Sequence, residues 1–156
     1  MQHRFKTIDI ERDFETCIKF RRDSYFVSFG TYSGFESEMR TYKNRMIDRI
    51  DHLPQGNCHL WSKNKIIGQT EMKLVDDLNV GYVNLLYLIP EYRAQGFGEL
   101  LHKQAVKVFS ELDKKTLHLS VSNSNKQALS FYSKHGWSNL GPRPDKDQVF
   151  LMSYVL

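Results

Sequence analysis

The chain has 156 residues, of which 40% are hydrophobic and 26% are charged, a balance typical of one globular domain spanning residues 1–156. Its formal net charge of +4 suits an anionic ligand, although it also suits nucleic acid or an ordinary solvated surface. The first residues are charged where a signal peptide is apolar, and no apolar run is long enough to span a membrane. We therefore expect a cytoplasmic protein with no membrane partner.

Neither the cysteines nor the histidines form a metal-binding pattern. Cys17 and Cys58 are too few and too far apart for a disulfide framework, so we expect buried thiols. The six histidines show no close pairing or HExxH spacing. The sequence therefore predicts no metal site.

In the first part of the chain, the pattern predicts a strand followed by two helices. Residues 3–10 alternate apolar and polar side chains, as a strand does. Asp13 can cap a helix that presents Phe14, Cys17, Ile18 and Tyr25 on one face. A second helix runs from about Phe35 to Ile50, before Pro54.

The rest of the chain predicts a sheet with two more helices. Strands are expected at 58–61, 66–75, 81–88, 117–121, 137–140 and 149–155, with a hairpin turn at 63–65. Leu101, Ala105 and Val108 have helical spacing, and Ser124 with Gln127 fits a capping box of a short helix. The strand–helix–strand crossover between 81 and 121 requires a parallel pair. The fold class is therefore mixed α/β (α+β), with about seven mostly antiparallel strands and helices on both faces.

A glycine turn joins the strand at 81–88 to the following helix. It reads Arg93-Ala94-Gln95-Gly96-Phe97-Gly98, and the open N–H groups of a helix start attract phosphate. Taken alone, this turn is equally compatible with a plain strand-to-helix connection. The GxGxxG and GxxxxGK[ST] patterns are both absent.

A second motif lies at 125–137, with the sequence NKQALSFYSKHGW. Phe131 is best explained as core packing, whereas Tyr132 can offer an O–H donor to a ligand in a neighbouring cleft. In this order, the two motifs resemble the GNAT superfamily of N-acetyltransferases. The residues that match its patterns are Arg93, Gly96, Gly98, Asn125, Ala128, Phe131, Tyr132, Lys134, Gly136 and Trp137. The chain departs from the pattern at Ala94, where many members have glycine, and at Trp137, where phenylalanine is usual.

The resemblance implies a transferase that uses acetyl-coenzyme A as cosubstrate. The cofactor is expected between the strands ending at Leu88 and Val121, which a bulge near 84–86 would separate. Its pantetheine arm would pair with the backbone of Leu86 and Leu88, as an added strand does. The implied cofactor-binding residues are Leu86, Leu88, Arg93, Ala94, Gln95, Gly96, Phe97, Gly98, Asn125, Tyr132 and Lys134, although Lys134 also fits a solvated surface.

The same resemblance suggests direct attack of an amine on the thioester. The backbone N–H of Leu86 would stabilise the developing oxyanion, and Tyr132 would protonate the leaving thiolate. For the general base, two candidates remain open. One is Glu71, and the other is a water chain through Asn84 or Ser120.

The acceptor is the least determined partner. The residues expected near it are Tyr25, Phe29, Tyr32, Phe35, Glu36 and Glu38, which suit a small cationic amine but also fit an ordinary core and surface. A protein amine and aminoacyl-tRNA are alternatives, and no other nucleic acid is expected. A non-catalytic acyl-coenzyme A sensor is the alternative from another class. The protein could be a monomer or a homodimer that pairs through its last strand.

Overall fold

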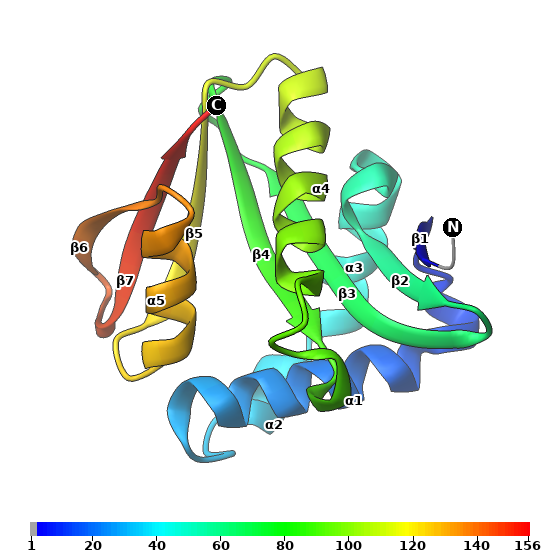
Figure 1. Cartoon of the computed structure of the whole chain (residues 1–156). Coiled ribbons are helices and arrows are strands. Elements are labelled where there is room, and N and C mark those ends of the chain that lie inside the picture. Colours follow the sequence, from blue (N-terminus) through cyan, green and yellow to red (C-terminus); the bar gives the residue numbers. More distant parts are fainter. Residues whose placement is uncertain (1–2) are drawn as a thin grey trace.

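The computed structural model describes residues 3–156, which build one seven-stranded sheet with helices on both faces (Figure 1). The strands are β1 (His3–Thr7), β2 (Cys58–Ser62), β3 (Lys65–Leu74), β4 (Val80–Leu88), β5 (Thr116–Ser122), β6 (Ser138–Arg143) and β7 (Lys146–Val155). The helices are α1 (Ile10–Phe29), α2 (Phe35–Met39), α3 (Tyr42–His52), α4 (Phe97–Glu111) and α5 (Lys126–Lys134). No helix in this range is long and apolar enough to cross a membrane.

The strand order is β1-β2-β3-β4-β5-β7-β6. Neighbouring strands are antiparallel except β4 and β5, which are parallel and joined by α4. The expected mixed sheet with one parallel pair is therefore confirmed. In Figure 1, α4 lies in front of the sheet and α3 lies behind it.

The parallel pair is short, and the two strands then separate. β4 pairs with β5 only over Val80–Val83, while both strands continue beyond this point. Figure 1 shows the resulting opening, with α1 running across its wide end. On the other side of β4, the register shifts between the pairs Met72–Val83 and Glu71–Leu85, which leaves Asn84 as the extra residue of a bulge. The expected bulge and strand separation are confirmed.

Apolar side chains fill both faces of the sheet around this opening. Phe109 and Ala105 of α4 pack on Leu117 of β5 in the larger cluster, and all three are fully buried. A Cβ at Gly81 would lie 2.4 Å from ring carbons of Phe109, so glycine is required for α4 to pack this closely on β4. Tyr42 belongs to a separate cluster between α1 and α3. The core thus fixes the two strands on either side of the opening.

Four expected boundaries were wrong. β1 ends at Thr7, and Asp9 caps α1 by accepting a hydrogen bond from the Arg12 amide at 3.1 Å, while Asp13 lies at a kink inside the helix. Both aspartates precede apolar residues, so spacing alone did not separate them. The expected helix at 35–50 is two helices, α2 and α3, because the backbone leaves helical geometry at Thr41.

The fourth correction concerns the start of α5. Asn125, not Ser124, is the cap, since its Oδ1 accepts a hydrogen bond from the Ala128 amide at 3.2 Å. The Ser124 hydroxyl instead donates to the Ser28 carbonyl at 2.8 Å. This hydrogen bond ties the start of α5 to the end of α1 across the wide end of the opening.

Candidate active site

Two cavities occupy the opening and share a wall formed by Ser24, Ser28, Leu86, Asn125, Ala128 and Tyr132. The turn cavity, about 220 Å³, extends past Leu88 to the turn before α4. The basic cavity, about 330 Å³, extends the other way to α2, α3 and the ends of β6 and β7. A long ligand in the turn cavity can therefore meet a second molecule in the basic cavity at this wall.

The turn before α4 exposes a row of backbone amides. Ala94 and Gly96 have positive φ angles of 59° and 92°, which turn the chain sharply ahead of the helix. Within residues 3–156, the amides of 95–98 donate to no other group. The dipole of α4 favours negative charge at the same point. A Cβ at Gly98 would lie 3.1 Å from the Phe131 ring, so glycine lets the helix start approach α5.

Arg93 holds this turn against α1 and β4. Its Nη2 donates to Asp23 at 2.7 Å, and its Nε donates to the Leu88 carbonyl at 2.9 Å. The guanidinium also lies over the Tyr87 ring, 5.3 Å from the ring centre. Arg93 lines the turn cavity, so it can place the remaining guanidinium N–H groups and its charge beside a bound anion.

Most of the cofactor-binding residues expected from the sequence lie together. Lining the turn cavity are Leu86, Leu88, Arg93, Gly98, Asn125 and Tyr132, and Ala94, Gln95, Gly96 and Phe97 belong to the adjoining turn. The Phe97 ring is half-buried against Tyr92, and its backbone amide belongs to the turn. Lys134 is exposed in the last turn of α5 and lines neither cavity.

Tyr132 lies at the wall between the two cavities. Its ring packs edge-on against Phe131 and Trp137, with centres 5.6 and 5.5 Å away. Its hydroxyl has no hydrogen-bond partner within residues 3–156, and Tyr132 lines both cavities. Burial raises the pKa of Tyr132 to about 12, so the hydroxyl keeps its proton at neutral pH.

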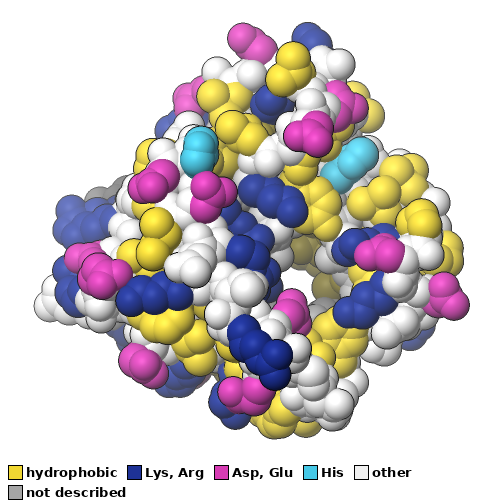
Figure 2. Space-filling view, turned by 180° about the vertical axis from the view of Figure 1, so that it is seen from behind, with side chains coloured by type: hydrophobic (Ala, Val, Ile, Leu, Met, Phe, Trp, Pro, Cys, Tyr) yellow, Lys and Arg dark blue, Asp and Glu magenta, His cyan; other side chains and the backbone are white. Residues whose placement is uncertain are grey.

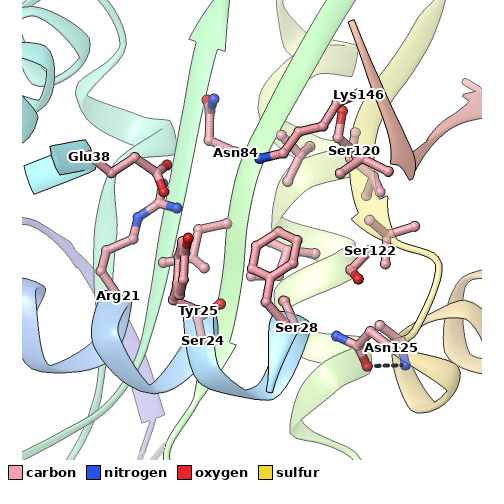
Figure 3. Close-up of a pocket in the computed structure, with 18 of the residues that line it drawn as sticks. Arg21, Ser24, Tyr25, Ser28, Glu38, Asn84, Ser120, Ser122, Asn125 and Lys146 are labelled. Carbon is pink, nitrogen blue, oxygen red and sulfur yellow. Dashed lines mark hydrogen bonds between the residues drawn. The ribbon is translucent and has the colours of Figure 1, made fainter. Parts of the chain in front are cut away.

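Asn84 of β4 and Ser120 of β5 both line the basic cavity (Figure 3). Asn84 Oδ1 is buried and has no hydrogen-bond partner in the described part of the chain. The Ser120 hydroxyl bonds to the Tyr82 hydroxyl at 2.6 Å and accepts from Arg143 at 3.3 Å. A buried amide oxygen without a partner is costly, so Asn84 is suited to meet a donor on a ligand.

Glu71 lies outside both cavities, in a buried cluster of donors. Its carboxylate is fully buried and accepts hydrogen bonds from Arg21, Arg49, Tyr42 and Gln69. Burial raises its pKa, but the charge and hydrogen bonds of Arg21, with help from Tyr42 and Arg49, outweigh burial and lower the pKa overall. These contacts favour a structural role for Glu71 over that of general base.

A Glu71→Gln variant should be strongly destabilised. The change leaves two arginines beside a neutral group, and breaking a buried pair in this way costs about 3–5 kcal/mol. Urea unfolding at neutral pH should show the loss. The folded-state pKa lies below the unfolded one, so the difference between variant and parent should shrink as the pH falls below about 4.3. A difference under about 1 kcal/mol at neutral pH would contradict this role.

The charge of the basic cavity differs from what the sequence suggested. Of the residues expected near the acceptor, Tyr25, Phe29, Phe35 and Glu38 line the cavity. Tyr32 and Glu36 do not, since both contact Arg22 instead. The cavity is also lined by Arg21, Arg45, Arg49, Arg143 and Lys146. Glu38 is the only acidic lining residue in the described part of the chain.

Sequence reasoning missed the arginines and the lysine of this cavity. Arg143 and Lys146 flank the turn Pro144-Asp145, which has the composition of any polar hairpin turn. Arg45 lies on a helix face that carries other charges. Only the pairing of β6 with β7 and the placement of α3 behind β3 bring these side chains to one cavity. Figure 3 shows Lys146 extending towards the middle of the cavity.

Comparison with known proteins agrees with this arrangement. Residues 14–137 match the model of the acetyltransferase (GNAT) family. A putative [ribosomal protein bS18]-alanine N-acetyltransferase of Bacillus subtilis (strain 168) is 30% identical over 122 residues, covering 77% of this chain and 72% of that protein.

Solved structures share the fold. The crystal structure of PaiA N-acetyltransferase from Thermoplasma acidophilum, in complex with coenzyme A, has a TM-score of 0.83 and 24% identity over the whole of both chains. Arabidopsis thaliana Naa50, in complex with the bisubstrate analogue CoA-Ac-MVNAL, has a TM-score of 0.75 and 15% identity, again over both whole chains.

The chain belongs to the GNAT family of acetyltransferases. It is a transferase that uses acetyl-coenzyme A as cosubstrate. The open amides before α4 and the unpaired edge of β4 fit the phosphates and the amide-bearing arm of that molecule. No group of three or more metal-binding side chains occurs among residues 3–156.

Proposed function

We propose that the protein acetylates the N-terminal amine of a protein or peptide acceptor. The observation that supports this proposal most strongly is the charge of the basic cavity, which begins at the shared wall beside Tyr132. Five basic residues and one acidic residue, Glu38, line it. Such a lining repels a polyamine, because like charges within a few ångströms disfavour one another. It therefore does not favour the small cationic acceptor expected from the sequence.

Two similar proteins support a peptide acceptor. The Bacillus subtilis relative is named for an alanine of ribosomal protein bS18, and the Naa50 structure holds an analogue carrying the peptide MVNAL. In this chain, the basic cavity lies between residues of α1 and α2 on one side and residues near the β6–β7 turn on the other. An extended peptide entering there would bring its first amine to the shared wall.

On this proposal, the turn cavity holds acetyl-coenzyme A. The amides of 95–98 and the charge of Arg93 bind its phosphates. The edge of β4 from Leu86 to Leu88 binds the pantetheine arm, since β5 no longer pairs with β4 beyond Val83. Asn125 uses its Oδ1 to cap α5, which leaves Nδ2 free to donate to the same arm.

The reacting groups meet at the wall between the cavities. The acetyl thioester supplies the acyl group that the acceptor amine attacks. The Leu86 amide stabilises negative charge on the carbonyl oxygen, and Asn84 Oδ1 accepts a hydrogen bond from the amine. The Tyr132 hydroxyl protonates the sulfur as it leaves.

The cavity also helps to supply the amine in its neutral form. Burial lowers the pKa of Lys73, and the nearby charges of Arg49, Arg143 and Arg45 lower it further. An acceptor amine placed beside the same arginines is subject to the same repulsion. Its proton can therefore pass to water at Asn84 or Ser120, without using Glu71.

Thiol release from acetyl-coenzyme A tests this function. We expect release with heptapeptides that have a free N-terminus and none with the same peptides blocked at that amine. Two further acceptors are tested in the same assay. One is a peptide with a blocked N-terminus and an internal lysine, and the other is the polyamine spermidine. Turnover of spermidine together with no turnover of any free N-terminal peptide would overturn the peptide assignment.

A further inference from the structure

The basic cavity holds positive charge that the chain itself does not neutralise. Arg21 and Arg49 share the single carboxylate of Glu71. Arg45 and Lys146 have no carboxylate partner among residues 3–156. Figure 2 shows a hollow on the rear face of the molecule with Lys and Arg side chains on both of its sides. Concentrated positive charge of this kind calls for an anionic ligand.

Arg45 has a buried donor that no group satisfies. Its Nη2 donates to the Glu38 carbonyl at 2.8 Å, and its guanidinium lies over the Tyr42 ring, 5.8 Å from the ring centre. Its Nε is buried and lacks any hydrogen-bond partner in the described part of the chain. An unsatisfied donor on a charged group is destabilising, and a ligand oxygen would satisfy it.

Arg143 approaches the cavity from the opposite side. Its Nε and Nη2 donate to the two carboxylate oxygens of Asp145 at 3.0 and 2.8 Å, but the two side chains are 36% and 64% exposed, so solvent weakens this ion pair. The Nη1 and Nη2 end of the guanidinium remains for a ligand. Its Nη1 reaches the Ser120 hydroxyl at 3.3 Å, near the wall where the amine would react. A guanidinium presents paired N–H donors that match the two oxygens of a carboxylate.

We propose that the basic cavity selects acceptors carrying a carboxylate close to the amine that is acetylated, and that Arg45 and Arg143 bind this carboxylate. The cavity is about 330 Å³, so the amine at Asn84 and the carboxylate at these arginines must belong to neighbouring parts of one acceptor. On the peptide acceptor proposed above, on which this inference rests, the carboxylate is that of Asp or Glu directly after the N-terminal residue.

Steady-state kinetics with matched heptapeptides tests this selectivity. The peptides begin Ala-Asp, Ala-Asn or Ala-Lys and are otherwise identical, and a fourth carries its Asp at position 6. We expect kcat/KM for Ala-Asp to exceed that for Ala-Asn roughly ten- to a hundredfold, as for other charge-assisted hydrogen bonds. Ala-Lys should be the poorest substrate, and Asp at position 6 should behave as Ala-Asn does. Free aspartate, as a small acceptor, shows whether the carboxylate must be part of a peptide.

Variants assign the preference to particular side chains. Arg143→Gln and Arg45→Gln should each lower kcat/KM for Ala-Asp roughly tenfold more than that for Ala-Asn, because Ala-Asn loses only the repulsion that helps to keep the amine neutral. Arg143→Glu should reverse the order of Ala-Asp and Ala-Lys. Arg4→Gln is the matched control, because Arg4 is an exposed residue of β1 at the far edge of the sheet.

Each outcome bears on a separate proposal. Equal rates for Ala-Asp, Ala-Asn and Ala-Lys would overturn the inference while leaving N-terminal acetylation intact. Equal loss for all three peptides in Arg143→Gln would also overturn it, since removal of a carboxylate-binding residue must lower the rate of Ala-Asp the most. Turnover of free aspartate but of no peptide would support the carboxylate site and overturn the peptide acceptor instead.

Discussion

Replacing Tyr132 with phenylalanine should lower kcat by about 10²-fold or more, the loss typical of a missing general acid. The change removes only the hydroxyl, and the ring can keep its edge-on contacts with Phe131 and Trp137. The KM for acetyl-coenzyme A should therefore change little. Steady-state rates of thiol release, measured with one peptide acceptor, give both constants.

A substrate with a more acidic leaving thiol shows whether Tyr132→Phe loses activity through proton transfer or through a change in structure. The difference in kcat between Tyr132→Phe and the parent should become smaller with an acetyl thioester whose thiol leaves without protonation. Tyr154→Phe is a matched control, because Tyr154 packs against the same Trp137, at 5.4 Å between ring centres, but lines neither cavity. An unchanged kcat in Tyr132→Phe would remove Tyr132 from the mechanism.

Gly96→Glu should abolish measurable binding of coenzyme A. Gly96 has a φ of 92°, which a residue with a side chain adopts only under strain. A glutamate there also adds negative charge beside the amides that are proposed to bind phosphate. Isothermal titration with coenzyme A measures the effect directly.

Gly141→Glu separates the effect of charge from that of backbone strain. Gly141 has a φ of 97°, and a Cβ there meets no atom within 4 Å, as at Gly96. Both variants therefore carry the same kind of strain and the same added charge, but Gly141 lies in β6, away from the turn. We expect Gly141→Glu to bind coenzyme A as the parent does. Equal loss in both variants would show that strain, not position, causes the effect.

Local sequence predicted those parts of the site that depend on neighbouring residues. The glycine turn is readable because Gly96 and Gly98 directly follow a strand and precede a helix with clear periodicity. The bulge near 84–86 was expected from the family resemblance, which places the cofactor between two separated strands, and it lies at Asn84. Ala94 shows the limit of this reasoning, since it keeps a positive φ without being glycine.

The charge around the acceptor could not be predicted in the same way. Glu71 alternates along β3 as a surface residue would, yet α1 and α3 supply arginines that enclose it. Arg143 reaches the cavity only because β6 pairs with β7 beside β5. Contacts of this kind join residues far apart in sequence, so they cannot be predicted from a local sequence pattern.

The central claim is that coenzyme A lies in the opening between β4 and β5, with its phosphates at the turn before α4. Amide chemical shifts followed by NMR during a titration with coenzyme A test this claim most directly. The largest changes should fall on the amides of 95–98 and of Leu86 to Leu88, while those of β1 and β2 stay unchanged. The account would be contradicted if the chemical shifts of the 95–98 amides stayed unchanged at saturation while the largest changes fell on other residues.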